Sequence, residues 1–177
     1  MDDMVPETSD VAPWRDWSEA ACTLLQYLYE TIGWDLWAVT RVEGDHQVVL
    51  HAHPTEAVRP GLSLPWEESF CRAMVTGEAP RVATVTAAVP AYSSRTMGPL
   101  AGVAAYIGVP LVAQDLQVWG TLCGLAFRAQ PRSATRDLPR VEMVARTLST
   151  LLAAGMTPRP VEVINGERVG HLGTSAD

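Results

Sequence analysis

Three cysteines, Cys22, Cys71 and Cys123, carry the side chains best suited to covalent chemistry in this chain. Two thiols that meet in a fold can act as a redox switch, because a thiolate attacks oxidants and disulfides. The three cysteines are dispersed and form no CxxC pair, which excludes a zinc cluster or a disulfide framework. Free cysteine also serves as a small buried hydrophobe, and no Lys or His adjoins these residues in the sequence. We therefore expect structural thiols, with a redox function of two of them as the alternative.

Histidines and polar loop residues provide two further candidate sites. His51 and His53 project to the same side of a predicted strand and could share a metal with a third ligand. Two histidines at a sheet edge need no metal, so we predict none. A second group of polar side chains could contact a ligand, with an arginine as the clamp for a carboxylate or phosphate. This group comprises Ser69, Arg72, Tyr92, Ser93, Ser94 and Arg95.

Composition excludes several classes of function. All 13 basic residues are arginine, so neither a Schiff-base lysine nor a P-loop lysine is present. No GxSxG, HExxH or GxGxxG motif occurs, so we assign no catalytic residue and expect a protein that is not an enzyme. The net charge of −7 disfavours nucleic acid and anionic membranes as partners. The N-terminus lacks the apolar core of a signal peptide, and we expect a cytoplasmic protein.

Hydrophobic periodicity predicts an α+β domain among 177 residues. Helices are expected over 16–32 and from 137 to 155, with a short helix within 66–77. Residues 34–53 predict two strands joined by a turn at Gly44-Asp45, and 103–112 and 117–127 predict two stronger strands. A brief strand is expected at 80–83, and a loop at 87–102. Direct connections between strands favour an antiparallel sheet, with the terminal helices on one face.

The two stronger strands indicate where a pocket should lie. Both faces of these strands are largely apolar, so both should be covered. The terminal helices account for one cover, and the irregular region from about residue 62 to 100 must form the other. Irregular chain packs less completely than a helix layer, which favours a pocket beneath it. We expect Trp66, Phe70, Tyr92 and Met97 to line this pocket from above, and Tyr106, Thr121 and Cys123 from below.

Four segments, DLWAVTRVEGD, ESFCRAMVTG, YIGVPL and WGTLCGLAF, resemble a GAF domain in their order and spacing. They are most similar to the sensory GAF modules of bacterial diguanylate cyclases and sensor kinases, and the resemblance covers roughly residues 17–154. It implies an antiparallel sheet of five to six strands, terminal helices on one face, and a ligand pocket under loops on the other. It also implies a sensory function: a small molecule binds, and the terminal helices signal to an output domain or to a protein in trans.

The resemblance adds residues to the predicted site and restricts its ligand. It places Trp37, Ser69 and Cys71 at the pocket, and it brings Cys71 close to Cys123. No covalent bilin is expected, because Cys71 and Cys123 are followed by Arg and Gly and not by His. The motif of cyclic-nucleotide-binding GAF domains and the Gly-Val-Cys-Gly context of the sulfoxide-reducing GAF enzymes are absent, as is a Gly-Gly-Asp-Glu-Phe output signature. The cofactor and the small-molecule ligand therefore stay unassigned.

These observations divide the chain into a disordered segment over 1–13, a GAF-like domain over 14–156, and a tail or linker over 157–177 that could form a small hairpin. A homodimer is expected through the terminal helices, because their apolar stripes, which include Trp17, Leu28 and Leu148, exceed what one sheet face would bury. Two alternatives to the sensor stay open. One is a thiol-based redox sensor or methionine-sulfoxide-reductase-like enzyme that uses Cys71 and Cys123. The other is a dimerisation module whose pocket has collapsed.

Overall fold

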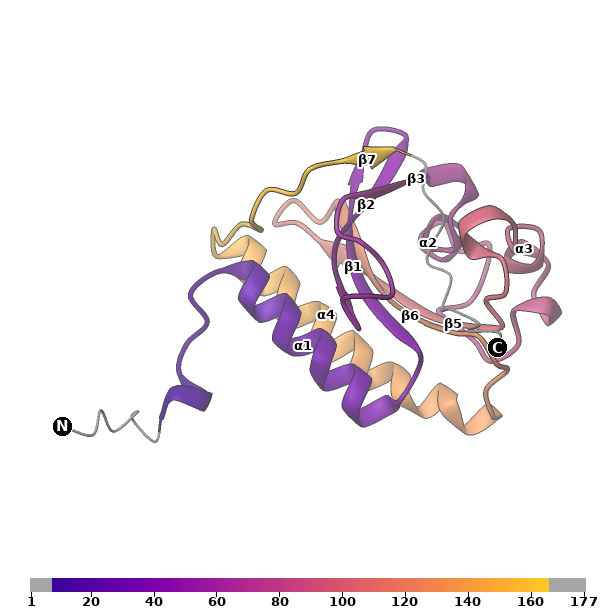
Figure 1. Ribbon diagram of the computed structural model, residues 1–177, viewed down its shortest axis with the longest axis horizontal. Helices are drawn as coiled ribbons and strands as arrows, with labels where there is room; N and C mark the ends of the chain where they lie inside the picture. The colour runs from indigo at the N-terminus through magenta and orange to yellow at the C-terminus, as the bar shows by residue number, and fades with distance from the viewer. Residues whose placement is uncertain (1–7, 166–177) are drawn as a thin grey trace, which may run out of the picture.

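An antiparallel sheet forms the centre of the computed structural model, which describes residues 8–165 (Figure 1). Its strand order is β4-β5-β6-β1-β2-β3-β7, and only the β3–β7 pair is parallel. The six antiparallel strands confirm the predicted sheet, and a two-residue strand from the tail extends it. The strands are β1 (Leu36–Glu43), β2 (His46–His53), β3 (Leu62–Pro65), β4 (Val82–Ala83), β5 (Ala105–Val112), β6 (Val118–Ala126) and β7 (Ile164–Asn165).

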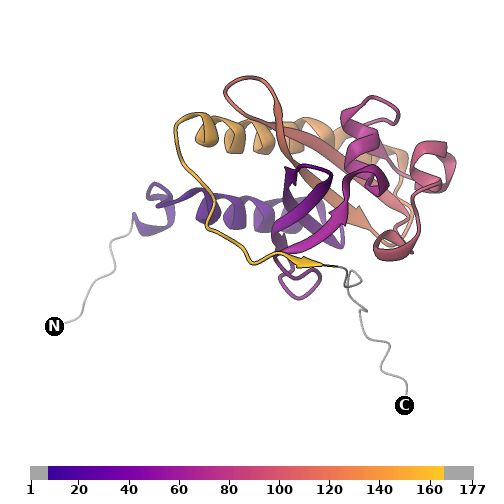
Figure 2. The same cartoon turned by 90° about the horizontal axis from the view of Figure 1, so that it is seen from above.

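Two long helices, α1 (Trp17–Ile32) and α4 (Leu138–Ala153), lie side by side on one face of the sheet (Figures 1 and 2). The Asp16 side chain begins α1 by accepting a hydrogen bond from the Glu19 backbone N–H at 2.8 Å. Gly33, with φ of 81°, ends it in the left-handed conformation that glycine adopts without strain. The terminal helices therefore cover one face, as predicted.

The apolar stripes of these helices are buried in the core of the chain itself. Trp17, Ala21, Leu28 and Leu148 are fully inaccessible, and the Trp17 indole N–H donates to the Leu148 carbonyl at 3.1 Å. These four positions therefore need no second copy to cover them, whereas Leu24 and Leu152 of the predicted stripes are partly buried, and the homodimer stays a prediction. One sheet face buries the four positions because the two helices pack against it together.

Short helices and irregular chain cover the opposite face (Figure 1). They belong to the region between residues 62 and 100, as predicted, and pack a second apolar cluster that includes Phe70, Tyr92 and Tyr106. The α-helices here are α2 (Phe70–Val75) and α3 (Pro90–Ser93), and the 3-10 helices are η2 (Trp66–Glu68), η3 (Thr86–Ala88) and η4 (Gly98–Leu100). Two further 3-10 helices lie elsewhere, η1 (Ser9–Val11) and η5 (Arg132–Asp137). The sheet is thus covered on both faces by different kinds of structure.

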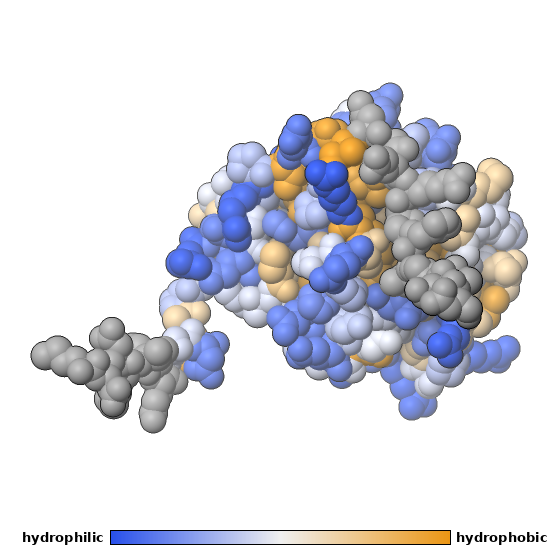
Figure 3. Space-filling model, viewed as in Figure 1, coloured by the Kyte–Doolittle hydropathy of each residue, from blue (hydrophilic) through white to orange (hydrophobic). Residues whose placement is uncertain are grey.

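The chain after α4 returns along the edge of the sheet to form β7 (Figure 2). The Ile164 N–H donates to the Gly61 carbonyl at 2.7 Å. A Cβ at Gly61 would lie 1.9 Å from the Glu162 carbonyl oxygen, so this close approach requires glycine. The face of the molecule seen in Figure 1 is mostly hydrophilic, with apolar residues gathered near β3 and β7 (Figure 3). The predicted hairpin of the tail extends past residue 165, and the predicted disordered segment begins before residue 8, so each lies partly outside the described residues.

The histidines considered for a metal site have other partners. The His51 ring nitrogen Nε2 lies 2.9 Å from the Ser18 hydroxyl, and the His53 ring packs edge-on against Tyr29. His46 contacts Asp45 at 2.6 Å. Within residues 8–165, no three metal-ligating side chains come together, and no helix has the length and apolar character needed to cross a bilayer.

Candidate functional site

Three buried polar side chains meet on the sheet face that points away from α1 and α4. The hydroxyl oxygens of Thr40 and Thr121 are 2.6 Å apart, and the Gln47 amide donates to them at 2.9 and 3.1 Å. They come from the neighbouring strands β1, β6 and β2. Side chains alternate between the faces of a strand, and a β-bulge beside Thr40 adjusts the β1–β2 register. The result is a polar floor within an otherwise apolar layer.

The Cys71 sulfur lies directly on this polar floor. The Thr121 hydroxyl donates to Cys71 Sγ at 3.2 Å and the Tyr106 hydroxyl does so at 3.4 Å. Helix α2 delivers Cys71, and the Ser69 side chain begins that helix by accepting from the Arg72 N–H at 3.0 Å. Gly108 leaves room for the phenol ring, because a Cβ there would lie 2.0 Å from Tyr106 Oη. Each of these placements depends on a small or capping residue nearby.

Cys123 completes the cluster from β6: it is buried, and its thiol lies close enough to Cys71 to affect the pKa of that residue. The Cys123 thiol is the largest cause that lowers the pKa of Cys71 below its usual value, although burial opposes the shift. Smaller lowering contributions come from Thr121, Tyr106 and Gln47. The Cys71 thiol, together with burial, raises the pKa of Cys123 well above its usual value. The surroundings therefore favour the thiolate form of Cys71 over that of Cys123.

A small inner chamber of about 50 Å³ lies between this cluster and its cover. Its polar contributions come from Thr40, Gln47, Ser69, Cys71 and Cys123, and hydrocarbon side chains supply most of the remaining wall. Ligand pockets usually measure roughly 300–1,000 Å³. The inner chamber alone is therefore far smaller than a metabolite site.

A larger outer cleft of about 390 Å³ adjoins the inner chamber. Leu64, Ser69 and Leu100 line both, so the two spaces meet at these residues. The outer cleft runs between the η2 segment on one side and the chain from Ser94 to η4 on the other. Its volume lies within the ordinary range for small ligands. The remaining lining residues are Pro65, Glu67, Glu68, Ser94, Arg95, Met97, Gly98 and Pro99.

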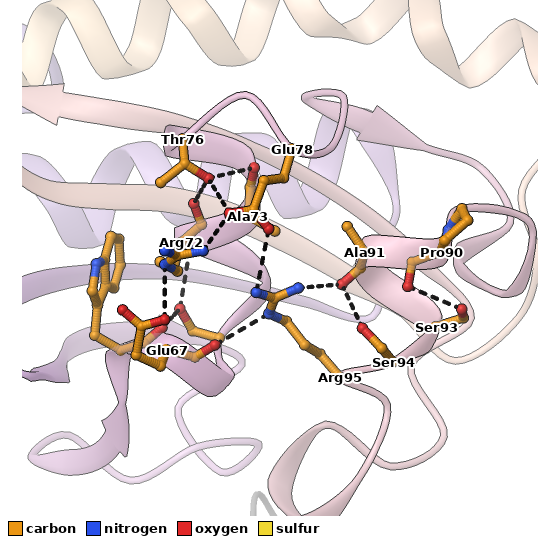
Figure 4. A network of polar contacts seen from close by, with 12 residues as sticks. Glu67, Arg72, Ala73, Thr76, Glu78, Pro90, Ala91, Ser93, Ser94 and Arg95 are labelled. Atoms are coloured by element: carbon orange, nitrogen blue, oxygen red, sulfur yellow. Dashed lines mark hydrogen bonds and ion pairs between the residues drawn. The ribbon is translucent and has the colours of Figure 1, made fainter.

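Ion pairs and carbonyl contacts hold the rim of the outer cleft (Figure 4). Arg95 donates to the carbonyls of Glu67 at 3.2 Å and Ala91 at 2.7 Å, and lies 3.6 Å from the Glu78 carboxylate. Arg72 pairs with Glu67 at 3.1 Å and also with Glu78. Both guanidinium groups considered as ligand clamps are thus engaged in joining α2, α3 and η2.

The structure brings most of the predicted site residues to the chamber or the cleft. Tyr92 lines neither space, but its ring packs against Phe70 and Tyr106, which line the inner chamber. Trp66 packs against the same apolar cluster but lines neither space. Thr121 reaches the site through its bond to Cys71. The predicted residues that line one of the two spaces are Ser69, Phe70, Cys71, Met97, Tyr106 and Cys123.

Trp37 is the predicted site residue that lies elsewhere. Its side chain points to the helix-covered face and is fully buried beside Trp34. The reason is alternation along β1, where Leu36 and Ala38 point into the inner chamber. Gly124 makes room for the indole, since a Cβ there would lie 2.8 Å from the ring. The expectation that Trp37 reaches the pocket is therefore corrected.

Thr40 and Gln47 are site residues that sequence reasoning missed. Both are polar residues within strands, and both are buried in the fold. Gln47 directly precedes the apolar run of β2. Its position next to this run was the available signal that it could be buried and hydrogen-bonded. Glu67 and Glu68 of the outer cleft were also missed. In the sequence they lie at the beginning of a predicted helix, where acidic residues are common, and this position gave no sign of a pocket.

Residues 16–153 match the sequence model of the GAF domain. The chain belongs to the GAF family. Solved structures agree with this fold: the free methionine-R-sulfoxide reductase of Neisseria meningitidis in complex with its substrate has 20% identity and a TM-score of 0.63, covering 82% of this chain and 83% of that one. The GAF domain of an Acinetobacter phosphoenolpyruvate-protein phosphotransferase has 14% identity and a TM-score of 0.59, covering 80% and 84%.

A third GAF structure, from a two-component sensor histidine kinase of Bacillus halodurans, has 11% identity and a TM-score of 0.59, and covers 77% of this chain and 93% of that one. No curated protein matches this sequence. At these identities the likeness establishes the fold alone. GAF is a sensory and regulatory fold, and its solved members include enzymes as well as signalling domains. The function must therefore be argued from the site.

Proposed function

We propose that this GAF domain is a non-enzymatic sensory or regulatory module that binds a small molecule in the outer cleft. The observation that carries the proposal is the junction of the 390 Å³ cleft with the inner chamber at Leu64, Ser69 and Leu100. A ligand seated in the cleft would contact these shared residues without entering the inner chamber. Movement of the shared residues would reach the buried polar floor through the chamber wall.

The walls of the cleft favour a ligand with an apolar body and a polar or cationic end. Leu64, Met97 and Leu100 supply apolar surface. Glu68 forms no ion pair within the described part of the chain, whereas Glu67 is paired with Arg72. A free carboxylate attracts a positive or hydrogen-bond-donating group. An anionic ligand would have to displace the carboxylates that already hold Arg72 and Arg95.

The sheet provides the route from this ligand to the terminal helices. Strand β6 carries Thr121 and Cys123 on the pocket face and Leu122 on the helix face. Helix α1 packs on β1 and β2, and α4 packs on β5 and β6. Close-packed interiors transmit strain. A shift of the polar floor would therefore move the surface on which α1 and α4 rest.

A thermal-shift screen of metabolites with the full chain tests this proposal. We expect at least one compound to raise the melting temperature of the wild type. Leu64→Trp should abolish that rise by filling the junction, whereas Leu116→Trp, at an exposed turn across the molecule, should keep it. A library without a single stabilising compound would instead favour an interaction module with a collapsed pocket.

A homodimer and an output partner belong to the same proposal. With the apolar stripes buried, the available apolar contacts on the outer helix faces are Tyr27 of α1 and Met143 of α4, which are 44% and 61% exposed. The mass in solution should be that of a dimer and should fall to that of a monomer for Met143→Glu. A monomeric wild type would reject the homodimer. The output domain or protein in trans would then bind these faces directly.

A thiol enzyme is the second candidate function, and the contact between Cys71 and Cys123 favours it. Two solved neighbours of the same fold are free methionine-R-sulfoxide reductases. If this candidate holds, the chain reduces a sulfoxide in the presence of a thiol reductant, and Cys71→Ser removes that activity. Turnover equal in the wild type and in Cys71→Ser would reject it.

A further inference from the structure

We propose that Cys71 and Cys123 form a peroxide-reactive dithiol, which closes into a disulfide between α2 and β6. This redox site goes beyond ligand binding in the outer cleft and does not depend on it. It concerns the inner chamber, which is too small for the ligand proposed above.

The surroundings of Cys71 are those of a stabilised thiolate. Two hydroxyl donors, from Thr121 at 3.2 Å and Tyr106 at 3.4 Å, converge on its sulfur, and Cys123 lines the same inner chamber. The Cys123 thiol and these donors lower the pKa of Cys71 below its usual value. Cys123 and Tyr106 are titratable groups that lower this pKa, and Tyr92 also interacts with Cys71 electrostatically. A thiolate is the form of cysteine that attacks an oxidant.

The size of the inner chamber selects the oxidant. A cavity holds one water molecule once it exceeds roughly 10–15 Å³, so 50 Å³ accepts only a few atoms. Hydrogen peroxide, with two heavy atoms, fits this space. Its path leads through the outer cleft past Leu64, Ser69 and Leu100. A substrate of metabolite size stays in the outer cleft, away from the sulfur.

The reaction proceeds in two balanced steps. The Cys71 thiolate attacks one peroxide oxygen, the O–O bond breaks, and the departing hydroxide takes a proton and leaves as water. Cys71 then carries a sulfenic acid. The Cys123 sulfur attacks that sulfur, its proton joins the departing hydroxide, and a second water forms with the S–S bond. Overall, two thiols are oxidised to one disulfide while one hydrogen peroxide is reduced to two waters.

The disulfide would tie the pocket cover to the sheet. Ser69 and Phe70 directly precede Cys71, and both line the inner chamber. A bond from Cys71 to β6 would hold this part of the cover against the polar floor. The junction at Ser69 would then no longer open for a ligand. Oxidation thus acts as a second input on the same sensory domain.

Thiol counting on the intact chain tests the proposal. After treatment with hydrogen peroxide, alkylation under denaturing conditions should find one free thiol in place of three, and peptide mapping should find Cys71 joined to Cys123. The matched control is Cys22→Ser, which removes the exposed thiol and should still lose two thiols. In Cys123→Ser, the reaction should stop at a sulfenic acid on Cys71, seen as the mass of one added oxygen atom on the intact chain.

The rate of thiol oxidation, measured for the wild type and Tyr106→Phe, tests the proposal even if a cysteine variant fails to fold. In the wild type, the rate of thiol loss should rise with pH and level off at a lower pH than for an ordinary cysteine, as the thiolate fraction saturates. Tyr106→Phe keeps the ring and removes one donor, so its rate at neutral pH should fall several-fold and its plateau should move to higher pH. Three remaining thiols in folded wild type would overturn the proposal, as would oxidation confined to Cys22. Both readouts are obtained without ligand, so they are independent of the thermal-shift screen.

Discussion

Replacement of Thr121 by valine removes one hydroxyl from the buried polar floor and keeps a side chain of similar volume. The hydroxyl contacts Thr40 Oγ1 at 2.6 Å, Gln47 Nε2 at 3.1 Å and Cys71 Sγ at 3.2 Å. Thr121 is fully buried, so water cannot replace the lost partner. Gln47 keeps its bond to Thr40 at 2.9 Å, which limits the damage.

These contacts give the size of the expected effect. A typical intramolecular hydrogen bond contributes about 1 kcal/mol net, and a buried polar group left without a partner costs roughly 1–3 kcal/mol. Thr121→Val should therefore lower the free energy of unfolding by about 2–3 kcal/mol. In a domain of this length, that corresponds to a fall in melting temperature of roughly 5–10 °C.

A double-mutant cycle with Thr40→Val distinguishes the polar floor from ordinary packing. Urea denaturation of both single variants and the double variant should give a coupling energy above about 0.5 kcal/mol, because the two hydroxyls contact each other at 2.6 Å and share Gln47 as a donor. Additive losses would refute the reasoning, as would a single variant as stable as the wild type. Thr121→Val should also raise the pKa of Cys71, seen as slower alkylation at neutral pH.

Three further outcomes test other parts of the fold. Gly124→Ala places a Cβ 2.8 Å from the Trp37 ring, and such overpacking should cost about 1–3 kcal/mol in urea denaturation; an unchanged midpoint would show that the indole can move. Burial, and then the charge of Arg159, lower the pKa of His51 below 6.5, so the unfolded chain binds the proton more readily. The stability associated with neutral His51 is present above pH 6.5 and lost as the pH falls below it. Between about pH 8 and about pH 5.5, the melting temperature should fall less steeply for His51→Gln than for the wild type. Arg95→Met removes the bonds to two carbonyls at the rim of the cleft and should increase proteolysis in that loop at native pH; equal cleavage rates would contradict a clamp.

Local pattern predicted the framework of this domain well. The helical spacing from Asp16, the glycine at position 33 and the alternation of β5 and β6 each depend on residues close in sequence. Alternation alone divides β5 into two faces, with Tyr106 on the face opposite to Ile107 and Val109. The resemblance carried by four segments then predicted the approximate number of strands and placed the terminal helices and the pocket on opposite faces of the sheet.

The candidate site depended on contacts between distant elements. Alternation states that Trp37 and Ala38 point to opposite faces, but only the tertiary structure shows which face the helices cover. Gln47 reads as a polar residue at the beginning of a strand, and it becomes part of the site because β2 lies beside β1, next to β6. Likewise, no local signal brings Cys71 to Cys123. The sequence by itself determined which segments are helices and strands and which residues carry thiols and hydroxyls, because those properties are local. The tertiary structure decided which of these side chains share a buried space, because hydrogen bonding and burial depend on neighbours that are remote along the chain.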